Sequence, residues 1–188
     1  FHTLIYTIMK NKNESPWSGL VKVLHIQHLS KNGDILWEDY NLKNIFHTEG
    51  EAFVLNSVFS GGNNPNTFIP NNYYFGLDGR ISPNAGDSMA DILGEPVTNG
   101  YFRQTISSEG QFSVSEVEGV NQANGPIIQF SASGGSWGPV RQLFLTNATG
   151  LSGDLIATVA LSSEITLSDG ESVNMRMGLS LRDCPPAP

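Results

Sequence analysis

This sequence has few cysteines and few charged residues. Its 188 residues include one cysteine, Cys184, which excludes an internal disulfide and a zinc site built from several thiolates. We interpret Cys184 as a spare thiol, and a chain without a disulfide framework suits a reducing compartment. Charged residues make up 15% of the chain, against roughly 25% in an average globular protein. A chain of this length can nevertheless fold on ordinary packing alone.

Positive charge is the scarcer of the two signs. Ten Lys and Arg stand against 18 Asp and Glu, which gives a net charge of −8 at pH 7 and a pI near 4.8. The cations are scattered, and an acidic chain repels both the phosphate backbone of nucleic acids and anionic lipid surfaces. We therefore expect no direct nucleic acid partner and no membrane partner.

Long apolar runs are also missing. No stretch approaches the roughly 20 residues that a membrane-spanning helix needs. The apolar stretch at residues 1–9 is short and has no basic residues before it, so it matches a signal peptide poorly. The sequence therefore predicts a chain that folds in water.

Motifs that carry catalysis or hold a cofactor are absent. There is no P-loop, no dinucleotide-binding fingerprint and no catalytic Cys–His arrangement. The Gly-x-Ser-x-Gly pattern at residues 134–138 has the letters of a nucleophile elbow, but Pro139 and a strand-like run follow it, and no histidine comes after His47. We interpret it as a Gly-rich turn with Trp137 as its anchor. The sequence therefore predicts no enzyme, no catalytic residues and no cofactor.

Possible metal ligands occur, but not in a metal-binding pattern. His25 and His28 are three residues apart, which on a strand places them on opposite faces. Four acidic residues lie in or beside one long loop: Asp78, Asp87, Asp91 and Glu95. They lack the spacing of a calcium-binding loop, so we predict no metal site.

Turn residues between short apolar runs are what the sequence has in plenty. Asn32-Gly33 stands between two such runs and is the strongest short signal for a β-hairpin. Residues 173–182 alternate apolar and polar side chains, which indicates a strand with one buried face. Residues 49–60 have the apolar spacing of one short helix, and two glycines follow it.

These elements predict a mainly β chain. The expected strands are residues 3–10, 20–29, 35–42, 73–77, 101–106, 112–117, 127–132, 140–146, 155–161 and 173–182, with a helical turn near 88–92 inside a long connection at 78–100. We predict an antiparallel β-sandwich, of which a jelly roll is one form. We expect a single domain at residues 1–182, with residues 1–42 as an added strand pair or arm, and a Pro-rich tail at 183–188.

Several short motifs follow one another in order between about residues 42 and 182. They are Thr-Glu-Gly at 48–50, Gly-Gly at 61–62, Tyr-Tyr-Phe-Gly-Leu at 73–77, Ala-Gly-Asp-Ser-Met-Ala at 85–90, Glu-Pro at 95–96, Gly-Tyr-Phe-Arg at 100–103, Leu-Ile-Ala at 155–157 and Asp-Gly-Glu-Ser-Val at 169–173. This order resembles a broad group of structural proteins of tailed phages and prophages. The resemblance implies a virion component and brings no catalytic residues with it.

On this resemblance we expect a capsid decoration (cement) protein that stabilises a phage head, in the virion after assembly in the host cytoplasm. Its partners are then the major capsid protein and further copies of itself. An N-terminal arm, and the arginine and aromatic residues that interfaces favour, supply the contact candidates. These candidates are Phe1, Leu4, Tyr6, Trp17, Arg80 and Trp137.

Two alternatives stay open on the sequence alone. One is a tail, baseplate or fibre-associated module that binds carbohydrate by stacking Trp17 and Trp137 on sugars. The other is a glycan hydrolase, since a pair of carboxylates facing each other across a cleft is not visible in a sequence. Copy number in particles separates decoration from a tail role, and turnover of a polysaccharide would establish the hydrolase.

Overall fold

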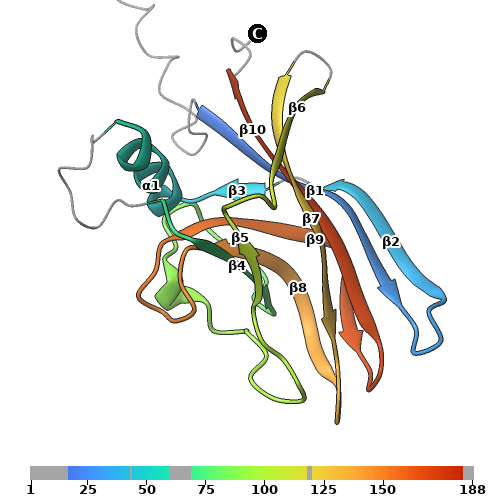
Figure 1. The fold of residues 1–188 in the computed structure, drawn as a ribbon. Coiled ribbons are helices and arrows are strands. Elements are labelled where there is room, and N and C mark those ends of the chain that lie inside the picture. The colour runs from blue at the N-terminus through green and yellow to red at the C-terminus, as the bar shows by residue number, and fades with distance from the viewer. Residues whose placement is uncertain (1–16, 43, 60–68, 118–119, 184–188) are drawn as a thin grey trace, which may run out of the picture.

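The computed structural model describes residues 17–42, 44–59, 69–117 and 120–183 (Figure 1). In this part of the chain the strands form two five-stranded sheets in which all paired neighbours are antiparallel. Sheet A has the order β2 (Ile35–Leu42), β1 (Trp17–Leu29), β10 (Ser172–Asp183), β7 (Val120–Ser131), β6 (Ser113–Val117). Sheet B has the order β3 (Asn44–Phe46), β9 (Leu155–Leu167), β8 (Trp137–Thr146), β4 (Asn72–Asp78), β5 (Gln104–Ser107).

The predicted antiparallel β-sandwich with one short helix is confirmed. The helix α1 (Thr48–Phe59) lies within one residue of its expected bounds. The predicted hairpin joins β1 to β2, and Gly33 in its turn has a φ of 88°, which suits glycine. Early strands return beside late ones in both sheets, β1 beside β10 and β3 beside β9. The jelly-roll form of the sandwich stays a prediction.

The main core lies between the two sheets. In β10, Val173, Met175 and Met177 are at most 1% exposed, and they share one core cluster with Leu143 and Leu145 of β8. The period of two is thus confirmed from Val173 to Met177, whereas Ser180 on the other face of β10 is buried as well, at 7% exposed.

Sheet B is buried on both of its faces. In β8 all residues from Gln142 to Thr146 are buried, although successive side chains of a strand point to opposite faces. Leu143 and Leu145 enter the core between the sheets, whereas Phe144 belongs to a second, smaller cluster. Something other than sheet A must therefore cover the second face of sheet B.

That cover is the connection between β4 and β5, residues 79–103, which we call the β4–β5 loop. Its 3-10 helix η1 (Met89–Asp91) packs Met89 and Ile92 against Phe144 and Leu155 of sheet B. The helical turn predicted near residues 88–92 is therefore confirmed. The loop is a packed layer on the sheet, and this packing fixes its place relative to the sandwich.

Several strands differ from their expected bounds: β1 and β8 each begin three residues earlier, and the short strand β3 was not expected. β7 begins at Val120 and β9 runs to Leu167, so both are longer than expected, and β5 begins only at Gln104. The side chains of Tyr101 and Arg103, just before β5, hold the β4–β5 loop instead of continuing the ladder. The expected strand at residues 3–10 and all but Asp183 of the expected tail lie outside the described residues. No helix in the described part of the chain is long and apolar enough to cross a membrane.

Candidate functional site

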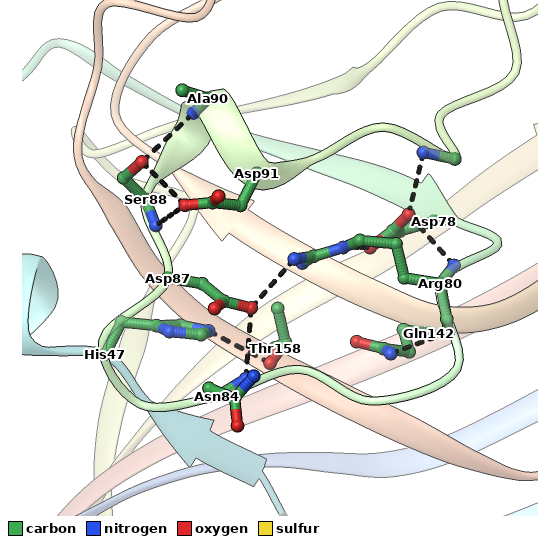
Figure 2. A network of polar contacts seen from close by, with 11 residues as sticks. His47, Asp78, Arg80, Asn84, Asp87, Ser88, Ala90, Asp91, Gln142 and Thr158 are labelled. Carbon is green, nitrogen blue, oxygen red and sulfur yellow. Dashed lines mark hydrogen bonds and ion pairs between the residues drawn. The ribbon is translucent and has the colours of Figure 1, made fainter.

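A buried ion pair fixes the start of the β4–β5 loop (Figure 2). Asp78 ends β4 and is 0% exposed. Its Oδ2 accepts a hydrogen bond from Nε of Arg80, and its Oδ1 accepts the backbone N–H groups of Arg80 and Gly94, each at 3.2 Å. Position 94 needs glycine, because a Cβ there would lie 2.7 Å from the same Oδ1. One carboxylate thus ties the beginning of the loop to its middle.

Arg80 extends this network to Asp87 and to sheet B. Its Nη1 donates to Oδ2 of Asp87 at 2.8 Å, and that oxygen also accepts the backbone N–H of Asn84 at 3.0 Å. Gln142 of β8 donates its side-chain N–H to the carbonyl oxygen of Arg80 at 2.8 Å. The guanidinium is therefore shared between two carboxylates while the backbone beside it is bonded to the sheet.

The helix η1 is held by its own cap. Oγ of Ser88 accepts the N–H of Ala90 at 3.3 Å, and Oδ2 of Asp91 accepts the backbone N–H and the hydroxyl of Ser88 at 2.8 and 2.9 Å. The backbone N–H of Ser88 is the main reason that the pKa of Asp91 lies below its ordinary value. Asp91 is therefore ionised at neutral pH, in the form that accepts both bonds.

A second ion pair, Glu95 with Arg103, fixes the end of the loop. Nε and Nη2 of Arg103 donate to Oε1 and Oε2 of Glu95 at 2.8 and 2.7 Å, the two-pronged geometry that suits guanidinium and carboxylate. The Tyr101 hydroxyl donates to Oε1 of Glu95 at 2.8 Å and accepts the N–H of Leu77 at 2.9 Å. Burial is the main cause that raises the pKa of Tyr101, so its phenol stays protonated and keeps donating to Glu95.

Arg103 also joins the β4–β5 loop to the β8–β9 connection. Its Nη1 donates to the carbonyl oxygens of Ala148 and Gly150 at 3.0 and 3.1 Å, and its Cζ lies 5.0 Å from the centre of the Phe144 ring. That ring lies over Gly76, where a Cβ would come within 2.1 Å of it. The Phe144 ring thus helps to position Arg103, and the ring can lie there only because residue 76 is glycine.

Trp137 is buried and holds the β4–β5 loop through its indole N–H. It is 4% exposed, and its indole N–H donates to the carbonyl oxygens of Thr98 and Asn99 at 3.1 and 3.0 Å. Its ring meets the ring of Tyr101 edge-on at 5.4 Å between centroids. The prediction that Trp137 offers a surface for a partner or a sugar is therefore wrong, because the loop covers the ring.

The same rigid loop and the β8–β9 connection hold large apolar side chains in solvent. Five of them are between 61% and 86% exposed: Ile81, Leu93, Val97, Phe102 and Leu151. The last four lie within two residues of Glu95, of Arg103, or of Gly150, whose carbonyl Arg103 binds. Ile81 directly follows Arg80. The ion pairs therefore fix the backbone from which these side chains project.

Of the six predicted contact residues, only Arg80 and Trp137 have described side chains. Both belong to this site, but their contacts are within the chain. The Arg80 side chain is 15% exposed and forms ion pairs with Asp78 and Asp87. The side chains of Phe1, Leu4, Tyr6 and Trp17 lie outside the described residues.

The sequence did not predict the exposed apolar residues of the site. Ile81, Leu93 and Val97 are isolated apolar residues in a stretch rich in Gly, Asn and Pro. That isolation is the usable signal, because a large apolar residue in a turn-rich loop has no neighbours along the chain to bury it.

The predicted acidic and histidine residues do not come together around a metal. Among the residues that the structure describes, no group of three or more His, Cys, Asp or Glu is placed to hold one. His25 pairs with Glu38 at 3.2 Å and His28 with Glu171 at 3.0 Å. His47 is 0% exposed, and burial is the main cause that lowers its pKa from 6.5, so it is neutral at pH 7.

Arg103→Lys tests whether Arg103 holds the β8–β9 connection. A lysine keeps the charge but cannot bond the Glu95 carboxylate with two prongs and two carbonyls at once. We expect the amides of residues 147–154 to exchange hydrogen at least about tenfold faster, measured by mass spectrometry. Arg141→Lys is the control, since Arg141 pairs with Glu164 and bonds Gly79 without touching this connection. Equal exchange in parent and Arg103→Lys would contradict the role of Arg103.

Comparison with known proteins assigns no family to the chain. No protein-family model matches the sequence and no curated protein matches it. The resemblance to phage structural proteins stays a prediction, and the function is argued from the geometry of the β4–β5 loop.

Proposed function

We propose that the protein is a structural component of a tailed-phage particle, a decoration protein that docks on the head shell through the β4–β5 loop. The observation that carries the proposal is that this loop exposes four large apolar side chains, and the β8–β9 connection bonded to it a fifth, while two arginine–carboxylate networks hold its backbone.

Rigidity and exposed apolar surface together favour docking. Long loops in compact proteins are usually functional, and exposed apolar side chains that gather in one region mark contact surfaces. Association loses free energy when it must order a flexible loop, and a loop that is already fixed avoids most of that loss. The β4–β5 loop therefore has the properties of a preformed contact surface.

Charge and sequence support the location on a phage head. The net charge of −8 suits an outer surface, away from the packaged DNA. Much of the resemblance to phage structural proteins rests on the motifs at 73–77, 85–90, 95–96 and 100–103. Those motifs supply Gly76, Asp87, Glu95 and Arg103, which place and hold the loop.

The first test is the copy number of the protein in purified particles, measured by quantitative mass spectrometry. Decoration of the head predicts hundreds of copies, comparable with the major capsid protein. A handful of copies would overturn head decoration in favour of a tail or baseplate location. Absence from the particles would overturn the virion role altogether.

The docking surface is tested by the double variant Leu93→Asp/Val97→Asp. Both side chains are more than 80% exposed, at 84% and 86%, so charging them should leave the fold intact. If they lie at the centre of the contact, we expect binding to undecorated heads to weaken on the order of a hundredfold in a sedimentation assay. Val114→Asp is the matched control, since Val114 is 73% exposed on β6 of sheet A. Unchanged binding of the double variant would reject the loop as the docking surface.

The carbohydrate alternative loses its main residue. It required the Trp17 and Trp137 rings to stack on sugars, but Trp137 lies in the core and the Trp17 side chain lies outside the described residues. No described residue takes its place in that role, so we do not propose it.

A further inference from the structure

The hairpin of β1 and β2, far from the β4–β5 loop along the chain, displays an acidic and aromatic surface. Leu36 and Tyr40 of β2 are 53% and 54% exposed, and they flank Glu38 on the same face of the strand. We call these three residues the β2 surface. β2 is the edge strand of sheet A, so the surface has no strand beside it on its outer side in the described residues.

Hydrogen bonds within the hairpin keep the Glu38 carboxylate ionised. Its Oε2 accepts from the Tyr40 hydroxyl at 2.9 Å and from Nε2 of Gln27 at 3.4 Å, and it lies 3.2 Å from Nε2 of His25. These hydrogen bonds, that of His25 first, lower the pKa of Glu38, so the carboxylate is charged at neutral pH. Its position is therefore fixed without a bound partner.

The Tyr40 ring has one covered face and one open face. It stacks on His25 with 4.4 Å between centroids and 6° between planes. His25 lies opposite Tyr40 on β1, so the second face of the ring looks away from β1, off the free edge of the sheet. An open aromatic face beside a carboxylate is the combination that binds an ammonium or guanidinium group.

The backbone of this edge is less suited to pairing with another strand. The N–H of Tyr40 already bonds to Oδ1 of Asp39 at 2.7 Å, and Asn41 has a φ of 54°, outside the range of a regular strand. A partner is therefore recognised by the side chains of the β2 surface: a cation for Glu38 and Tyr40, and an apolar group for Leu36.

One segment of this chain has that chemistry. Residues 1–16 contain two of the ten Lys and Arg, Lys10 and Lys12, and one of the 18 Asp and Glu, so they are net positive in an otherwise strongly acidic chain. The lysines follow directly on the apolar and β-branched residues 3–9. Charge and apolar character both complement the β2 surface.

The geometry disfavours contact with Glu38 of the same chain, because Lys10 reaches it only with residues 10–16 and both side chains fully extended, and Lys12 does not reach it. Glu38 lies opposite Gln27, ten residues along β1 from Trp17, a span of about 33 Å at the rise of a strand. Lys10 lies seven residues before Trp17, so its backbone reaches at most about 25 Å from there. We propose that residues 1–16 of one copy dock on the β2 surface of a second copy and so link copies of the protein. This contact goes beyond docking on a shell and does not depend on it.

Sedimentation velocity on the full chain over a range of concentrations tests the proposal. We expect the parent to self-associate, and Glu38→Lys to weaken the association by at least about tenfold, because it repels the lysines and removes the anion. Glu116→Lys is the matched control: it makes the same charge change at an exposed residue of β6, the opposite edge of sheet A, and should associate like the parent.

Exchanging the charges separates a lost contact from a lost fold. Lys10→Glu/Lys12→Glu should associate as weakly as Glu38→Lys when each is alone. A mixture of the two, with one fluorescently labelled, should form mixed assemblies, because the acidic segment of one fits the lysine of the other. A parent that stays monomeric, a Glu38→Lys variant that associates like the parent, or a mixture that stays unassociated would each overturn the proposal. Self-association without binding to heads would leave it standing and reject only the docking role of the β4–β5 loop.

Discussion

Asp78→Ala is expected to lower the free energy of unfolding by about 3–5 kcal/mol. Asp78 is 0% exposed and accepts three hydrogen bonds, from Nε of Arg80 and from the backbone N–H groups of Arg80 and Gly94. Its removal leaves a guanidinium that is 15% exposed with one carboxylate fewer, and two backbone donors without their acceptor. The loss is large because the partners stay buried, not because the ion pair itself is strong.

Equilibrium unfolding in urea at neutral pH measures this loss, and two variants calibrate it. Glu164→Ala breaks another arginine–carboxylate pair, but Glu164 is 50% exposed, so its loss should lower the free energy of unfolding by less than about 1 kcal/mol. Asp78→Asn keeps a side-chain oxygen that can accept the backbone N–H groups of Arg80 and Gly94, so it should be more stable than Asp78→Ala. An Asp78→Ala variant no less stable than Glu164→Ala would show that the network does not hold the loop.

The features that the sequence predicted well are those decided within a few residues. The Asn32-Gly33 turn needs a positive φ at its glycine, and the structure has 88° there. The alternation in residues 173–177 follows from one face that enters the core and a second face that holds the polar Asn174 and Arg176. The helix at 48–59 rests on spacing along a single segment. Local chemistry determines each of these.

The features that the sequence did not predict depend on contacts across the chain. The continuous burial of β8 arises because the β4–β5 loop covers the second face of sheet B. Arg103 reaches carbonyl groups 45 and 47 residues away, and Asp78 bonds an amide 16 residues away. No local pattern of residue types indicates contacts between residues so far apart in the sequence. The sequence therefore predicted a long loop, but not its packing against sheet B.

The candidate site was predicted in part. The sequence drew attention to the 78–100 connection, to its acidic residues and to Arg80, and all of these are in the site. On the sequence, calcium binding was the role considered for the acidic residues, and it was rejected. In the structure, Asp78, Asp87 and Glu95 accept hydrogen bonds from arginines. Without the fold, an acidic residue that pairs with an arginine cannot be told from one that faces water.

Trp137→Ala is expected to lower the free energy of unfolding by about 3–5 kcal/mol, a loss typical of a large aromatic residue removed from a core. Trp137 is 4% exposed, packs in the main core cluster, and meets the Tyr101 ring edge-on. Its indole N–H is also shared by the carbonyl groups of Thr98 and Asn99, so the substitution should free this part of the loop. Urea unfolding gives the stability, and hydrogen exchange at residues 98–103 reports on the loop.

Trp137→Phe separates the two contributions of this side chain. Phenylalanine keeps most of the apolar contact but donates no hydrogen bond. The carbonyl groups of Thr98 and Asn99 keep their backbone donors, the N–H groups of Tyr101 and Ser133, so the lost bond should cost only about 0.5–1.5 kcal/mol. If packing dominates, Trp137→Phe should retain most of the stability that Trp137→Ala loses, while exchange at residues 98–103 rises in both. A Trp137→Ala variant as stable as the parent would contradict the buried position of the ring. It would also restore Trp137 as a surface residue, and with it the carbohydrate reading that the fold disfavours.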